Sequence, residues 1–260
     1  MIRLAMGVLD GAKIMRDSVA VVRRNAALLW FPAISTVCLA LTAGFWVLWG
    51  ASLYETNGRP LVLVPLVIGG LYSLSFLGVF FSVALAAAAA EAVAGGDASV
   101  GDGIDVAFDR LGGIAGWAAI SILIALLIGF VKSIKGLRLV GTLGEVGWSF
   151  ATIFVVPLIA LDDEDAASAT RRSFQLAREN WKTESGGLVA LRAALLVPGV
   201  ILAVDWSLLS GGHVQSAPGK ALLVLVLLCG IAVGVAAGVV RQVFAVTLCH
   251  DATGLEPTAV

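Results

Sequence analysis

Six long apolar runs constrain what this chain can fold into more than any other feature. About 20 apolar residues, at 1.5 Å per residue, cross the ~30 Å hydrocarbon layer of a membrane. The runs cover residues 27–48, 61–90, 114–131, 143–161, 188–208 and 221–243. Hydrophobic residues make up 59% of the chain and charged residues 13%, against roughly 45–50% and 25% in soluble domains. The sequence therefore predicts an all-α integral membrane protein with about six transmembrane helices.

Three of the runs have unusual lengths. The run over 61–90 is longer than a crossing requires, so it must tilt, kink near Gly69 and Gly70, or extend into the cytosol. The runs over 114–131 and 143–161 are short for a crossing. They predict either two marginal crossings or one shallow hairpin.

Orientation follows from the distribution of lysine and arginine, which favour the cytoplasmic side. With the N-terminus inside, 12 of the 17 basic residues fall on the cytoplasmic side of six spans. The sequence thus predicts a multi-pass protein of the plasma (inner) membrane with both termini in the cytoplasm. Lys132, Lys135 and Arg138 fall on the outer side, which argues against full crossings by the third and fourth runs.

The chain divides into repeat-like units within one membrane domain over residues 1–260. The units cover about 1–94, 95–164 and 165–260, and each is predicted to be a hairpin of two spans preceded by an amphipathic interfacial helix. The first and third units share a serine, an arginine and an asparagine at equal spacing: Ser18, Arg23 and Asn25 against Ser173, Arg178 and Asn180. Their return helices share a Phe-x-Val-x-Leu pattern that begins at Phe81 and at Phe244.

Basic side chains on the amphipathic stretches are candidates for contact with anionic lipid headgroups. They are Arg16, Arg23, Arg171 and Arg178. Membrane lipid is accordingly the predicted partner. A net charge of −1 gives no reason to expect nucleic acid.

Three segments carry a resemblance to a known family. They are the Arg-Arg-Asn to Trp-Phe-Pro stretch over 23–32, the Phe-Val-Val-Pro-Leu stretch over 154–158, and the Arg-Arg-Ser to Trp stretch over 172–181. In these the chain resembles an uncharacterised bacterial and archaeal membrane family, catalogued as domain of unknown function 6159. The resemblance implies a six-span, helix-hairpin architecture in the plasma membrane and transfers no activity.

No motif for catalysis or for a cofactor is visible. The two histidines, His213 and His250, lie far apart in the sequence, and the three cysteines give no metal or redox spacing. Walker, HExxH, GxSxG and EF-hand patterns are absent from the sequence. We therefore predict no enzyme, no catalytic residues, no bound metal and no cofactor.

Ionisable residues in or near spans are the usual pointers to function, because they are costly there unless paired or hydrated. The candidates are Glu91, Arg192, Asp205 and Arg241. Counting along the predicted spans places Asp205 near the outer interface and the other three near the cytoplasmic one. Arginines at such positions also extend to headgroups without any function, so both interpretations stay open.

Glycines at four-residue spacing form candidate helix-packing faces. They are Gly230, Gly234 and Gly238 in the last span, and Gly112 and Gly116 at the start of the third. Such faces serve either packing within one chain or homo-oligomerisation.

The sequence leaves two functions open. The first is a non-enzymatic scaffold or a lipid- or partner-binding module of the plasma membrane. The second is a channel or small-solute transporter, in which a homo-oligomer would enclose the path. The absence of a continuous polar lining in any span favours the first.

Overall fold

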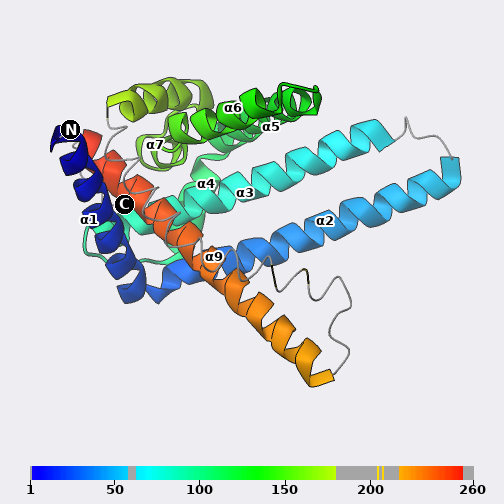
Figure 1. Cartoon of the computed structure of the whole chain (residues 1–260), viewed down its shortest axis with the longest axis horizontal. Helices are drawn as coiled ribbons and strands as arrows, with labels where there is room; N and C mark the ends of the chain where they lie inside the picture. Colours follow the sequence, from blue (N-terminus) through cyan, green and yellow to red (C-terminus); the bar gives the residue numbers. More distant parts are fainter. Residues whose placement is uncertain (1, 58–62, 180–203, 205–206, 208–216, 254–260) are drawn as a thin grey trace.

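The computed structural model describes residues 2–57, 63–179, 204, 207 and 217–253, and in these residues it contains helices and no strands (Figure 1). The α-helices are α1 (Ile2–Arg24), α2 (Trp30–Asn57), α3 (Leu63–Val93), α4 (Val100–Asp109), α5 (Leu111–Ser133), α6 (Arg138–Ala151), α7 (Val155–Asp162) and α9 (Ala217–Thr253). A 3-10 helix, η1 (Ala26–Leu29), links α1 to α2, and residues 166–179 are also helical. The predicted all-α class is confirmed.

Five stretches of the described chain are long and apolar enough to cross a membrane. They are Ala26–Glu55, Leu63–Val93, Leu111–Ser133, Arg138–Asp162 and Val224–His250. These stretches overlap the first, second, third, fourth and sixth predicted runs. The fifth predicted run, over 188–208, lies almost wholly outside the described residues.

The long second run forms one uninterrupted helix, α3. A Cβ atom added at Gly69 would lie 2.9 Å from the ring of Trp46 in α2, and one added at Gly70 would lie 3.3 Å from it. The two glycines therefore permit close approach of α2 and α3, where the sequence had also allowed a kink.

The fourth predicted run is not one continuous helix. α6 has 14 residues, about 21 Å at 1.5 Å per residue, and residues 152–154 separate it from α7. Pro157 accounts for the interruption, because its nitrogen cannot donate to the carbonyl four residues earlier and its ring crowds that carbonyl. α5, with 23 residues, is long enough to cross alone, and an ion pair between Lys132 and Glu145 joins it to α6.

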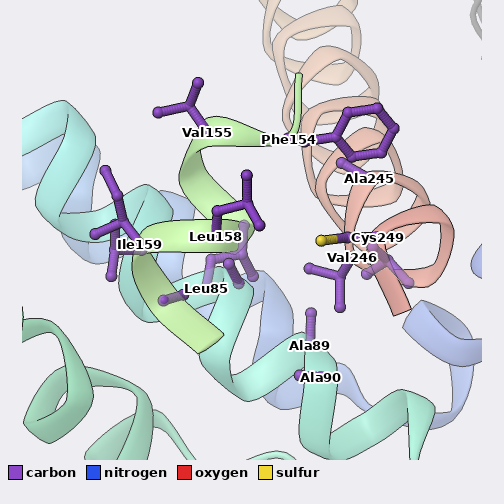
Figure 2. Packing of buried hydrophobic residues seen from close by; sticks show 14 of the residues in the cluster. Leu85, Ala89, Ala90, Phe154, Val155, Leu158, Ile159, Ala245, Val246 and Cys249 are labelled. Atoms are coloured by element: carbon purple, nitrogen blue, oxygen red, sulfur yellow. The ribbon is translucent and has the colours of Figure 1, made fainter. Parts of the chain in front are cut away.

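Buried side chains gather at one end of the long helices. This region, which we call the hub, comprises the second half of α3 (79–92), the second half of α9 (239–249), η1, α4, α7 and residues 166–179, with α1 packed on α9. In Figure 1 the hub lies where α1, α4, α7 and the C-terminal part of α9 meet. Figure 2 shows its interior, where Phe154 lies beside Ala245 of α9 and Leu158 lies near Leu85 of α3.

Outside the hub, the long helices expose their apolar side chains. The buried share of an 18-residue apolar stretch differs among the long helices. It is only 11% in α2, 17% in α5 and 19% in α9, against 56% in α3. Large apolar side chains such as Leu41, Leu48 and Phe130 are exposed, and a soluble monomer rarely exposes extensive apolar surface of this kind. This surface is what a multi-pass membrane protein presents to lipid.

α1 and the helix over 166–179 each have one buried face, and Arg16, Arg23, Arg171 and Arg178 lie on their exposed surfaces. Met15, Ser18 and Val22 of α1 are buried, at a spacing that follows one face of a helix. Leu176 is likewise buried, whereas Val19 is 39% exposed. The burial of Val22 comes from packing within the protein.

Candidate functional site

Five ion-pairing side chains, two basic and three acidic, join the elements of the hub where α7 ends. Arg172 contacts Asp162 and Glu164, each at 2.6 Å, and Arg110 at the α4–α5 junction contacts Asp163 at 2.7 Å. The carboxylates of Asp162 and Glu164 are largely buried, with side-chain exposures of 13% and 17%. The cluster thus ties the end of α7 to the helix over 166–179 and to the start of α5.

Local hydrogen bonds shift the pKa of Arg172 in this cluster and of Asp165 beside it. The hydrogen bond to Glu164, with the nearby charge of Asp162, raises the pKa of the Arg172 guanidinium. Asp165 accepts hydrogen bonds from the Ser168 hydroxyl and from the backbone N–H of Ala167, which lower the pKa of its carboxyl group. Asp165 therefore caps the helix over 166–179 in its ionised form.

Ser173 stabilises the break between α6 and α7. Its hydroxyl donates to the carbonyl of Ala151 (2.7 Å) and accepts from the N–H of Phe154 (3.2 Å). Both backbone groups lack helical partners because the helix is interrupted between them. A fully buried serine thus satisfies both sides of the break.

A polar cavity of about 210 Å³ lies beside this break. Ser82 of α3, Ser149 of α6, Thr152, Ile153 and Val156 around the break, and Arg241, Gln242 and Ala245 of α9 line it. Among these described lining residues none is acidic. The cavity therefore combines one cation, several neutral polar groups and an apolar wall.

The hydrogen bonds that the lining groups already make determine whether each group can still donate or accept a hydrogen bond in the cavity. The Ser82 and Thr152 hydroxyls donate to the carbonyls of Gly78 (2.7 Å) and Trp148 (2.8 Å), so their remaining capacity is to accept. Arg241 donates to the Ser149 hydroxyl at 3.3 Å. The Nε2 atom of Gln242 is buried and has no hydrogen-bond partner among the described residues.

The candidate charges from the sequence lie in different places. Glu91 is exposed at the end of α3. Arg241 is exposed on α9, which continues for 12 residues beyond it to Thr253, and its predicted position near the cytoplasmic interface stays a prediction. Arg192 and Asp205 lie outside the described residues.

Of the four candidate glycines whose surroundings the structure describes, Gly116 has a tight neighbour. A Cβ added at Gly116 would lie 2.9 Å from that of Ala166. At Gly112 of α5, and at Gly234 and Gly238 of α9, an added Cβ meets no described atom within 4 Å. The described residues thus supply no packing partner for those three positions, and a glycine face on α9 remains a prediction.

The four candidate headgroup-binding arginines are all exposed on hub helices. Arg16 and Arg23 lie on α1, and Arg171 and Arg178 lie on the helix over 166–179. They point away from the buried core, so the positions suit a contact outside the protein.

Sequence reasoning missed the groups that meet in the cavity. Ser82, Thr152 and Gln242 stand in separate apolar stretches, where each looks like an isolated polar residue. The single usable signal was Pro157, which predicts a helix interruption within the fourth run. Their meeting depends on the packing of α3 and α9 around that interruption.

Comparison with known proteins gives one match. A family model described as "Family of unknown function (DUF6159)" matches residues 62–255. No curated protein and no solved structure matches the chain. Its start at residue 62 leaves α1 and α2 outside the match.

Proposed function

Because the chain belongs to the DUF6159 family of unknown function, which assigns no activity, we propose a role from its geometry. The protein is a non-enzymatic, multi-pass plasma-membrane protein that binds anionic lipid headgroups through its hub. In this proposal the chain has six spans, and the hub and both termini lie at the cytoplasmic face. One observation supports the proposal most strongly: Arg16 and Arg23 of α1 and Arg171 and Arg178 of residues 166–179 are exposed at the same end where the core is buried.

Charge is segregated within the hub in a way that suits this role. α1 exposes Lys13, Arg16, Arg23 and Arg24 against a single exposed acid, Asp17, in its described half. The acids concentrate elsewhere, on α4 (Asp102, Asp105 and Asp109) and in the ion pairs of residues 162–164. A basic helix at the membrane surface gains roughly 1 kcal/mol per lysine or arginine from anionic lipid.

Hydrogen exchange of the full chain in nanodiscs tests the role of α1. We expect phosphatidylglycerol, added at 30 mol% to phosphatidylcholine, to slow exchange of the α1 amides at low salt. Arg16→Glu together with Arg23→Glu removes roughly 2 kcal/mol of attraction, about 30-fold in the binding equilibrium. The protection gained from phosphatidylglycerol should then disappear, and 0.5 M salt (on the order of a 4 Å Debye length) should have the same effect.

A matched control changes the same number of charges far from α1. Lys135→Glu with Arg138→Glu lies at the α5–α6 turn, and the lipid-dependent protection of α1 should persist in that variant. If the protection of the α1 amides from hydrogen exchange depends neither on phosphatidylglycerol nor on salt, these arginines do not bind headgroups.

A channel or small-solute transporter is the second candidate. The polar cavity beside the α6–α7 break supports it, because transporter sites form around interrupted helices. Ion flux through liposomes containing the full chain would favour this alternative over the first.

A further inference from the structure

We infer that the cavity beside the α6–α7 break binds an oxyanion of the phosphate type. The inference does not depend on headgroup binding by α1, since no residue of α1 lines the cavity. It rests on the chemistry of the lining groups, which come together from α3, α6, α9 and the break between α6 and α7.

Three of the lining residues offer hydrogen-bond donors to the cavity. The Arg241 guanidinium carries several N–H groups in a planar fork, a geometry that matches phosphate oxygens. Gln242 adds a buried amide nitrogen with no described partner, a costly arrangement unless a ligand or water accepts from it. Ser149, which accepts from Arg241, keeps its own hydroxyl proton to donate.

The cavity also offers acceptors. The protons of Ser82 and Thr152 are committed to backbone carbonyls, so each oxygen can accept from a ligand hydroxyl. With both donors and acceptors in its lining, the cavity suits a phosphodiester that also carries hydroxyl groups. The headgroup of phosphatidylglycerol has this composition, and inorganic phosphate shares its oxyanion.

The surroundings strengthen such binding. Ser82 lies 11 residues before the end of α3 and Arg241 lies 12 before the end of α9, about 17 Å along each helix. Ile153, Val156 and Ala245 complete the wall. Arg241 itself is exposed in the described chain, and these apolar neighbours reduce the local polarity of the cavity, which strengthens the attraction between a guanidinium and an oxyanion relative to water.

Native mass spectrometry of the full chain, released from micelles that hold equal phosphatidylglycerol and phosphatidylcholine, tests the site. We expect one phosphatidylglycerol retained per chain. Arg241→Gln removes charge-assisted hydrogen bonds and should weaken retention roughly 10- to 100-fold. Gln242→Glu keeps the size of the side chain but sets a carboxylate against the oxyanion, and it should weaken retention similarly. Lys135→Gln, at the exposed α5–α6 turn and outside the cavity, is the control and should retain the lipid.

A second arm uses the unaltered protein, so it does not depend on the folding of any variant. Sodium phosphate is titrated against sodium chloride at equal ionic strength, and the melting temperature is followed. Retained lipid that phosphate does not displace identifies the lipid phosphodiester as the ligand. A phosphate-specific rise in melting temperature, without retained lipid, identifies free phosphate. The site is overturned if the protein retains no phosphatidylglycerol and phosphate does not raise its melting temperature. It is also overturned if the wild type, Arg241→Gln and Gln242→Glu retain the lipid equally.

Discussion

Gly103→Ala is expected to lower the free energy of unfolding by about 1–3 kcal/mol, the usual cost of overpacking. The new Cβ atom would lie 2.5 Å from the backbone oxygen of Ala84 and 2.9 Å from the ring of Phe31. A backbone oxygen cannot rotate away as a side chain can, so α3 and α4 would have to separate. Thermal or denaturant unfolding of the purified protein in detergent measures the change.

Gly101→Ala is the matched control, because it lies two residues away in the same helix. Its Cβ would meet only the Ser99 hydroxyl, at 3.7 Å. Alanine is a better helix former than glycine by up to about 1 kcal/mol, so this variant should be unchanged or slightly more stable. Equal stability of the two variants would mean that α3 and α4 do not pack as closely as described.

Arg172→Met is expected to cost about 3 kcal/mol of stability. Methionine retains much of the apolar stem but removes the guanidinium that lies between Asp162 and Glu164. Two largely buried carboxylates then face each other without their shared cation, and removing one partner of a buried ion pair is strongly destabilising. Unfolding in detergent, read together with hydrogen exchange of residues 155–179, shows whether the loss is local to the hub.

Arg171→Met provides the comparison for Arg172→Met. Arg171 is the adjacent residue, is exposed, and is joined to no carboxylate by the ion pairs described here. A surface substitution of this kind usually changes stability by less than about 0.5 kcal/mol. If both variants lose the same stability, the ion pairs of Arg172 contribute little to holding the hub together.

The spans could be predicted from sequence because they depend on local composition. Each described span overlaps an apolar run, since about 20 apolar residues in a row have few other stable environments. The ends were less predictable. α9 reaches Thr253 because Phe244, Val246 and Leu248 are buried inside the hub, which makes it continue beyond the length that lipid alone requires.

The site and the close helix contacts could not be predicted, because they depend on which distant segments meet. The GxxxG spacing drew attention to Gly234 and Gly238, yet among the glycines whose surroundings are described the one with the least room for a Cβ is Gly103, which has no glycine four residues away. Likewise, the polar residues of the cavity stand in three separate helices and around one break. The spacing of residues along one helix predicts which of them share a face of that helix. It does not predict which other segment packs against that face.

Cysteine accessibility in intact cells tests the central claim, that the hub lies on the cytoplasmic side of a membrane crossed by the apolar helices. Cys38, Cys229 and Cys249 are replaced by alanine, and single cysteines are placed at Glu55, near the end of α2, or at Gly101, on the exposed surface of α4. A membrane-impermeant thiol reagent should label the Glu55→Cys protein in intact cells, and the Gly101→Cys protein only after the membrane is permeabilised. Labelling of Gly101→Cys in intact cells, or protection of Glu55→Cys, would contradict the account.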